Sequence, residues 1–102
     1  MKDVLSPDGR FKAVVFERDC GATTGFSTQI SVLRAWRGLP NDGGNVFIAD
    51  DRSGQLALHN GVLDVSVTWT SPGRLEIAYP KGCRIFKRAD RWGDLVIGYS
   101  ER

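Results

Sequence analysis

Closely spaced turn signals constrain the fold of this 102-residue chain more than any other sequence feature. Pairs of proline, glycine, asparagine and aspartate favour tight turns, and here they interrupt the apolar runs after only a few residues. We expect turns at residues 6–9, 60–61, 71–74, 80–82 and 90–93. Several short runs bounded by such signals alternate between apolar and polar residues, as strands do.

The two longest strand-like runs indicate which faces of a sheet would be buried. The centre of residues 11–18 is apolar on both faces, so this strand is expected to be central and covered twice. Residues 26–33 alternate between apolar and polar positions. The polar positions Ser27, Gln29 and Ser31 are therefore expected to face water.

These patterns predict an all-β fold of about seven short strands in one domain over residues 1–102. The connections look too short for parallel crossovers, so we expect an antiparallel meander. The meander would be curled into a half-barrel or folded into a two-layer sandwich. Around Asn60 and Gly61 a two-residue hairpin turn is expected, and the alternative is a short helix over residues 51–58.

Composition and charge exclude several classes of protein. The chain is 41% hydrophobic and 25% charged, which is typical of globular domains, and its net charge of +2 does not by itself indicate nucleic-acid binding. The apolar runs fall short of the ~18 residues that a membrane helix needs. The first residues do not resemble a secretory leader, so the chain as written is expected in the cytoplasm.

Two cysteines and one histidine limit the chemistry that the chain can carry out. Cys20 and Cys83 would form one disulfide in an oxidising compartment and two thiols in a reducing one. As a nucleophile Cys20 would need a base, and no spacing argument brings His59 near it. A cysteine-dependent enzyme using Cys20 and Thr24 is therefore the weakest hypothesis, and we expect no metal or cofactor.

The segment between the two long strands is the first candidate binding site. Its threonines can cap backbone amides and its glycines can adopt positive φ angles. It is either a tightly folded structural loop or a loop that contacts a ligand or partner. The candidate residues are Asp19, Cys20, Gly21, Thr23, Thr24 and Gly25.

A basic segment near the C-terminus is the second candidate. Cationic and aromatic side chains on a sheet can bind single-stranded nucleic acid by stacking and phosphate contacts. The alternative is a charged outer strand that resists edge pairing. The candidate residues are Arg84, Lys87, Arg88, Arg91 and Trp92.

Three sequence blocks carry a resemblance to a known group of proteins. They are the Ser-Pro-Asp-Gly turn at residues 6–9, the apolar residues 13–16, and the Asp-Cys-Gly-Ala-Thr-Thr-Gly-Phe-Ser-Thr-Gln run at residues 19–29. With them the chain resembles a family of small uncharacterised bacterial proteins, of the kind found on mobile gene cassettes. Many relatives have a lipoprotein-like leader, so the resemblance implies an extracytoplasmic location. It implies a β-domain and no mechanism.

The leading functional hypothesis is a non-enzymatic binding or interaction domain that uses a sheet face or edge. Its partner would be a protein or a small molecule, and self-association through an edge strand is included because an open meander has two edges. A single-strand nucleic-acid-binding domain is the alternative.

Overall fold

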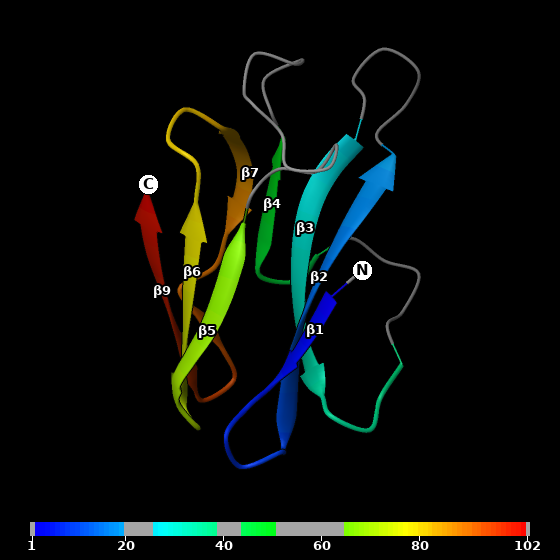
Figure 1. The fold of residues 1–102 in the computed structure, drawn as a ribbon, viewed down its shortest axis with the longest axis vertical. Helices are drawn as coiled ribbons and strands as arrows, with labels where there is room; N and C mark the ends of the chain where they lie inside the picture. The colour runs from blue at the N-terminus through cyan, green and yellow to red at the C-terminus, as the bar shows by residue number, and fades with distance from the viewer. Residues whose placement is uncertain (1, 20–25, 39–43, 51–64, 102) are drawn as a thin grey trace.

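Two facing β-sheets build the fold (Figure 1), and the computed structural model describes residues 2–19, 26–38, 44–50 and 65–101. Across the first sheet the order is β1 (Lys2–Leu5), β2 (Phe11–Asp19), β3 (Phe26–Arg34), β4 (Phe47–Asp50) and β7 (Arg84–Arg88). Across the second it is β5 (Ser66–Ser71), β6 (Arg74–Tyr79), β9 (Leu95–Glu101) and β8 (Arg91–Trp92). The all-β prediction is confirmed, and the architecture is the two-layer sandwich.

The described ranges contain nine strands and no helix, so none of their segments is a helix long and apolar enough to cross a membrane. The prediction of about seven strands missed the short strands β1 and β8. The predicted turn at residues 90–93 contains β8, and the chain turns just after it, at residues 93–94. The predicted Asn60-Gly61 hairpin and the alternative helix at residues 51–58 lie outside the described residues.

The strand order departs from the predicted antiparallel meander in two places, at the pairing of β7 with β4 and at the pairing of β9 with β6. Strand β9 pairs parallel to β6, with Leu75 opposite Ile97. Between them the chain crosses to the first sheet, where β7 pairs with β4, and then returns through β8. A parallel pair needs a connection of about a dozen residues or more. Residues 80–94 provide it, because the chain passes through β7 in the other layer and β8 in its own layer instead of through a helix.

The core lies between the sheets and takes apolar side chains from both. Strand β2 lies between β1 and β3, as its apolar sequence predicted. Burial of these side chains is the main force that holds the layers together. The first sheet contributes Ala13, Ile30, Val32, Val46, Phe47 and Ala49, and the second contributes Val67, Leu75, Ile77, Tyr79, Leu95 and Ile97.

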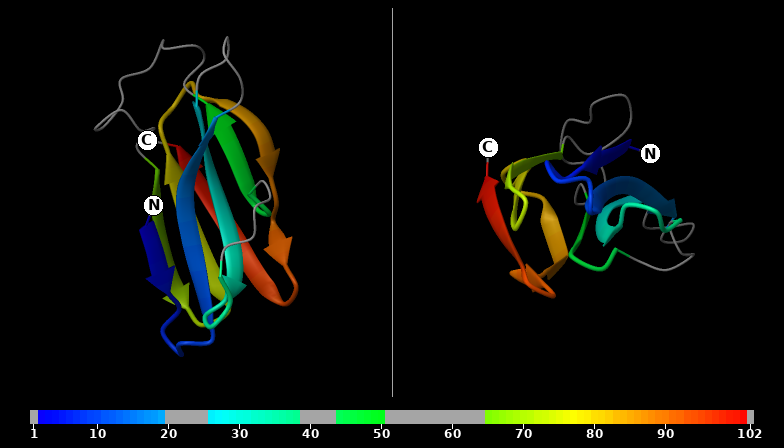
Figure 2. Two further views of the ribbon diagram at one scale, coloured as in Figure 1. Left: turned by 90° about the vertical axis from the view of Figure 1, so that its right-hand side faces the viewer. Right: turned by 90° about the horizontal axis from the view of Figure 1, so that it is seen from below.

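The two sides of the sandwich are closed differently (Figure 2). On one side the edge strands β1 and β5 meet, and Trp69 Nε1 donates a hydrogen bond of 3.0 Å to the Val4 carbonyl. On the other side the chain passes from β7 to β8 through residues 89–90. There the Ala89 N–H donates to Val46 O at 2.8 Å, and the Ile97 N–H donates to Asp90 O at 2.8 Å.

The polar face of β3 is buried, so the expectation that it faces water is wrong. Ser27, Gln29 and Ser31 are only 0%, 4% and 3% exposed. Gln29 Oε1 accepts a 2.6 Å bond from the Gly44 N–H, and Ser31 Oγ accepts a 3.1 Å bond from the Asn45 N–H. Gln29 Nε2 also donates to Ser27 Oγ at 2.6 Å. The polar residues pair with a segment that covers them, which alternation alone cannot reveal.

Asn45 continues the ladder of β3 with its side chain. The Val32 N–H donates to Asn45 Oδ1 at 2.8 Å, and Asn45 Nδ2 donates to Val32 O at 2.8 Å. The amide group therefore replaces a peptide unit beside β3, ahead of the point where β4 begins. Both backbone groups of Val32 are satisfied without a further strand residue.

Gly44 is predicted to be intolerant of any side chain because its backbone passes close to two strands. A Cβ atom there would lie 2.7 Å from Phe47 O and 2.9 Å from Ile30 O, which are both backbone atoms. We expect Gly44→Ala to lower the free energy of unfolding by about 1–3 kcal/mol, measured by urea denaturation. The control is Gly38→Ala, where a Cβ would meet no atom within 4 Å. Equal stability of the two variants would contradict the close approach at Gly44.

Candidate functional site

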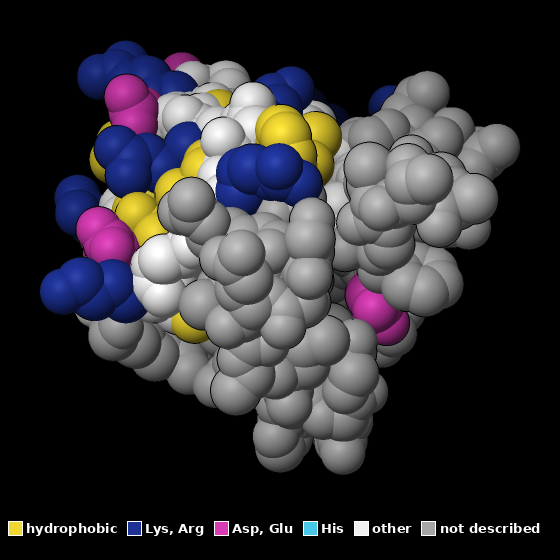
Figure 3. Space-filling view, turned by 90° about the horizontal axis from the view of Figure 1, so that it is seen from above, with side chains coloured by type: hydrophobic (Ala, Val, Ile, Leu, Met, Phe, Trp, Pro, Cys, Tyr) yellow, Lys and Arg dark blue, Asp and Glu magenta, His cyan; other side chains and the backbone are white. Residues whose placement is uncertain are grey.

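The structure divides the predicted basic segment between two sheets. Arg84, Lys87 and Arg88 lie on β7 at one edge of the first sheet, whereas Arg91 and Trp92 form β8 at an edge of the second. Figure 3 shows Lys and Arg side chains, with hydrophobic side chains and some Asp and Glu side chains among them, on the side where β9 ends and β7 begins. The five predicted residues therefore do not form one stripe along a single strand.

A β-bulge interrupts the pairing of β7 with β4. Ile48 pairs with Lys87, but the next residue of β4, Ala49, pairs with Ile85. Phe86 is thus the extra residue of the bulge, without a partner in the ladder. A bulge of this kind breaks the alternation of side chains and re-aims them.

The bulge sorts the side chains of β7 into two groups. Arg88 pairs with the fully buried Phe47, so both side chains lie on the face of the first sheet that points toward the second sheet. All five residues of β7 are exposed, Arg88 included, and Phe86 retains 58% of its accessible surface. The guanidinium carbon of Arg84 lies 5.2 Å from the centre of the Phe86 ring. We call Arg84, Phe86 and Lys87 the β7 outer surface.

Arg88 is held by two tyrosines of the second sheet. Its guanidinium carbon lies 5.3 Å from the ring centre of Tyr99, and its Nη1 donates to the Tyr79 hydroxyl at 3.2 Å. The Tyr99 hydroxyl lies 2.7 Å from Ala89 O and 3.1 Å from Val46 O. Burial raises the pKa of Tyr99 to about 12, despite the nearby charge of Arg88. Arg88 therefore anchors β7 to the second sheet.

The raised pKa of Tyr99 predicts that the folded protein loses stability at high pH. The unfolded chain loses the phenolic proton near pH 10, whereas the folded chain keeps it until about pH 12. Stability should therefore be unaffected by this group below about pH 10 and should fall as the pH rises toward about 12. We expect a shallower fall in Tyr99→Phe when urea unfolding is followed across this range. Equal slopes in the two proteins would contradict the raised pKa.

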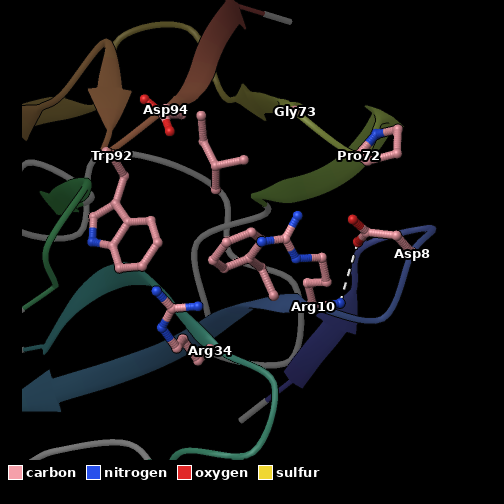
Figure 4. A pocket seen from close by; sticks show the side chains of 10 residues that line it. Asp8, Arg10, Arg34, Pro72, Gly73, Trp92 and Asp94 are labelled. Atoms are coloured by element: carbon pink, nitrogen blue, oxygen red, sulfur yellow. Dashed lines mark hydrogen bonds between the residues drawn. The ribbon is translucent and has the colours of Figure 1, made fainter.

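A second candidate site is a cavity of about 430 Å³ at one end of the sandwich (Figure 4), which we call the end cavity. The beginning of β2 and the end of β3 form one part of its wall. The turn at residues 72–73, the turn after β8 and the turn before β2 form other parts. The end cavity therefore joins residues of both sheets that are far apart in the sequence.

Four side chains dominate this cavity. Phe11 and Trp92 meet edge to face, with ring centres 5.6 Å apart. The guanidinium carbons of Arg10 and Arg34 lie 5.6 and 5.7 Å from the centre of the Phe11 ring. Arg34 is opposite Phe11 in the ladder between β2 and β3, so strand pairing fixes this contact. Trp92 thus belongs to the end cavity and not to the β7 outer surface.

The predicted turn at residues 6–9 builds the next part of the wall. The Gly9 N–H donates to Ser6 O at 2.9 Å, and Gly9 has a φ of 72°, which suits glycine. Asp8 Oδ1 accepts bonds from the Ser6 hydroxyl at 2.6 Å and the Arg10 N–H at 3.2 Å. These bonds lower the pKa of Asp8, with the hydroxyl bond contributing most. Asp8 is therefore a carboxylate at neutral pH.

The predicted loop at residues 19–25 is described only at its margin. Asp19 pairs with Phe26 at the end of the β2–β3 ladder, so residues 20–25 connect two neighbouring antiparallel strands. Cys20 and His59 lie outside the described residues. Cys83 is half-buried and packs against the core, and its bond to Cys20 stays a prediction. The described residues contain no group of three metal-ligating side chains.

Comparisons with known proteins found no matching family model, no matching curated protein and no matching solved structure. The resemblance noted from the sequence therefore stays a prediction.

Sequence reasoning missed the end cavity, apart from Trp92, which it assigned to a different surface. A signal was present, because Arg10-Phe11 begins one long strand and Arg34 ends the next. A hairpin places such ends side by side. The contribution of Asp94 depends on the crossover to β9, which the predicted meander did not contain.

Proposed function

We propose that this chain is a non-enzymatic interaction domain that binds an extended, acidic segment of a protein partner along β7. The observation that carries the proposal is an exposed strand at the edge of a sheet with cationic side chains on its outer surface. An extended peptide can add a strand to such an edge, where backbone hydrogen bonds give affinity and side chains give specificity.

Strand β7 is the edge best suited to this role. Strands β1 and β5 face each other across one side of the sandwich and are joined by the bond between Trp69 and Val4. Strand β8 has only two residues. All five residues of β7 are exposed, and β4 pairs with it along one side.

The charges of β7 select the partner and oppose self-pairing. In an antiparallel pair of two β7 strands centred on Phe86, Arg84 of one copy would lie opposite Arg88 of the other. Like charges directly opposite each other destabilise a strand pair. A partner strand with acidic residues would instead bring opposite charges to Arg84 and Lys87. The outer surface therefore favours an acidic strand over a second copy of this chain.

Single-stranded nucleic acid is the alternative, and the geometry supports it less well. Binding of single strands uses several aromatic rings on which successive bases stack. The β7 outer surface has one ring, Phe86, and the guanidinium of Arg84 already lies over it. Arg88 is bound to tyrosines, and Trp92 faces the end cavity.

Charge reversal on the β7 outer surface should weaken partner binding. The probe is a fluorescently labelled peptide of alternating glutamate and valine, measured by anisotropy at low ionic strength. We expect Arg84→Glu with Lys87→Glu to weaken binding at least about tenfold, because two charge-assisted contacts are replaced by repulsion. The matched control is Lys2→Glu with Arg37→Glu, which makes the same change in net charge at two exposed positions elsewhere.

Three outcomes would contradict the proposal. Equal weakening by both double variants would show that net charge, and not β7, drives the binding. A lysine–valine peptide that binds as well as the glutamate peptide would remove the charge complementarity. A labelled oligothymidylate that binds when the acidic peptide does not would favour the nucleic-acid alternative.

A further inference from the structure

We propose that the end cavity is a binding site for a small aromatic carboxylate that carries an N–H or O–H donor at its other end. This site shares no residue with the β7 outer surface and does not depend on the proposed partner. Its volume of about 430 Å³ lies within the ~300–1,000 Å³ usual for small-molecule sites.

Two guanidinium groups supply the recognition of a carboxylate. Arg10 and Arg34 lie against Phe11, which restricts both side chains before a ligand arrives. Within the part of the chain that the structure describes, neither guanidinium has a carboxylate oxygen within 4.0 Å. An arginine binds a carboxylate with two parallel hydrogen bonds, so it selects a planar anion.

The apolar walls favour an aromatic body. The edge-to-face pair of Phe11 and Trp92 leaves ring surface on the cavity wall, and Pro72 and Leu95 complete the apolar lining. Flat rings pack well against such surfaces. Figure 4 shows Trp92 and Pro72 on different sides of the space above the two arginines.

Two carboxylates determine which charge the ligand carries and how it is oriented in the cavity. Asp94 lies in the wall away from Arg10 and Arg34 (Figure 4), where it can accept a hydrogen bond from the far end of a ligand. Asp8 is ionised, because its hydrogen bonds lower its pKa. The negative charges of these two carboxylates offset the positive charges of the two arginines. This charge balance disfavours polyanions such as nucleic-acid backbones. It favours a monocarboxylate with a donor group.

The test compares four probes in titrations that follow the indole N–H of Trp92 by NMR. The probes are 4-hydroxybenzoate, benzoate without the donor, phenol without the carboxylate, and inorganic phosphate without the ring. We expect binding to be tightest for 4-hydroxybenzoate. Arg34→Gln should weaken it about tenfold or more, since a charge-assisted pair is lost. Arg37→Gln, which changes an exposed arginine outside the cavity, should leave it unchanged.

A second variant tests the orientation of the ligand. In Asp94→Asn the preference for 4-hydroxybenzoate over benzoate should shrink, while binding of benzoate itself is retained. The NMR spectrum of each variant shows whether the protein remains folded. A Trp92 signal that does not move at millimolar 4-hydroxybenzoate would overturn the proposal. Tighter binding of inorganic phosphate, or equal binding in Arg34→Gln, would overturn it as well.

Discussion

A cluster of three aromatic rings between the sheets determines the rest of the structure. Phe47 of β4 lies with its ring centre 5.7 Å from Tyr79 and 5.9 Å from Tyr99, and the two tyrosines are 6.4 Å apart. The cluster joins the first sheet to the parallel pair of β6 and β9. Its hydroxyl groups bind Arg88 and the carbonyl of Ala89, so it also fixes where β7 ends and where the chain crosses. The cluster acts together with the ladder between β4 and β7 and the backbone bonds of Ala89 and Ile97, which hold the same crossing.

Both candidate sites combine arginine with an aromatic ring, but the pairs serve different chemistry. On β7, Arg84 covers Phe86 on an open edge, which suits a partner that supplies its own backbone hydrogen bonds. In the end cavity, Arg10 and Arg34 flank Phe11 in a partly open space between turns. The first arrangement fits an extended chain and the second fits a small molecule. The two proposed sites share no residue, so each proposal can be tested without the other.

Sequence reasoning succeeded where the structure is local and failed where it depends on distant segments. The Ser6–Gly9 hydrogen bond and the central position of β2 were predicted from residue types alone. The polar face of β3 was misread as exposed, because nothing in its alternation reveals that Gly44 and Asn45 cover it. The basic segment was identified, but a bulge and a change of sheet separated its members.

The sequence by itself determined the all-β class, the positions of several turns and the core strands, because turn chemistry and alternation are properties of neighbouring residues. Only the tertiary structure decided the strand order, the parallel pairing of β9 and the faces of β7. Those features follow from side-chain packing between segments that lie far apart along the chain. The end cavity belongs to the same group: Arg10, Arg34 and Trp92 become a site only because the two sheets pack and bring three distant turns to one end.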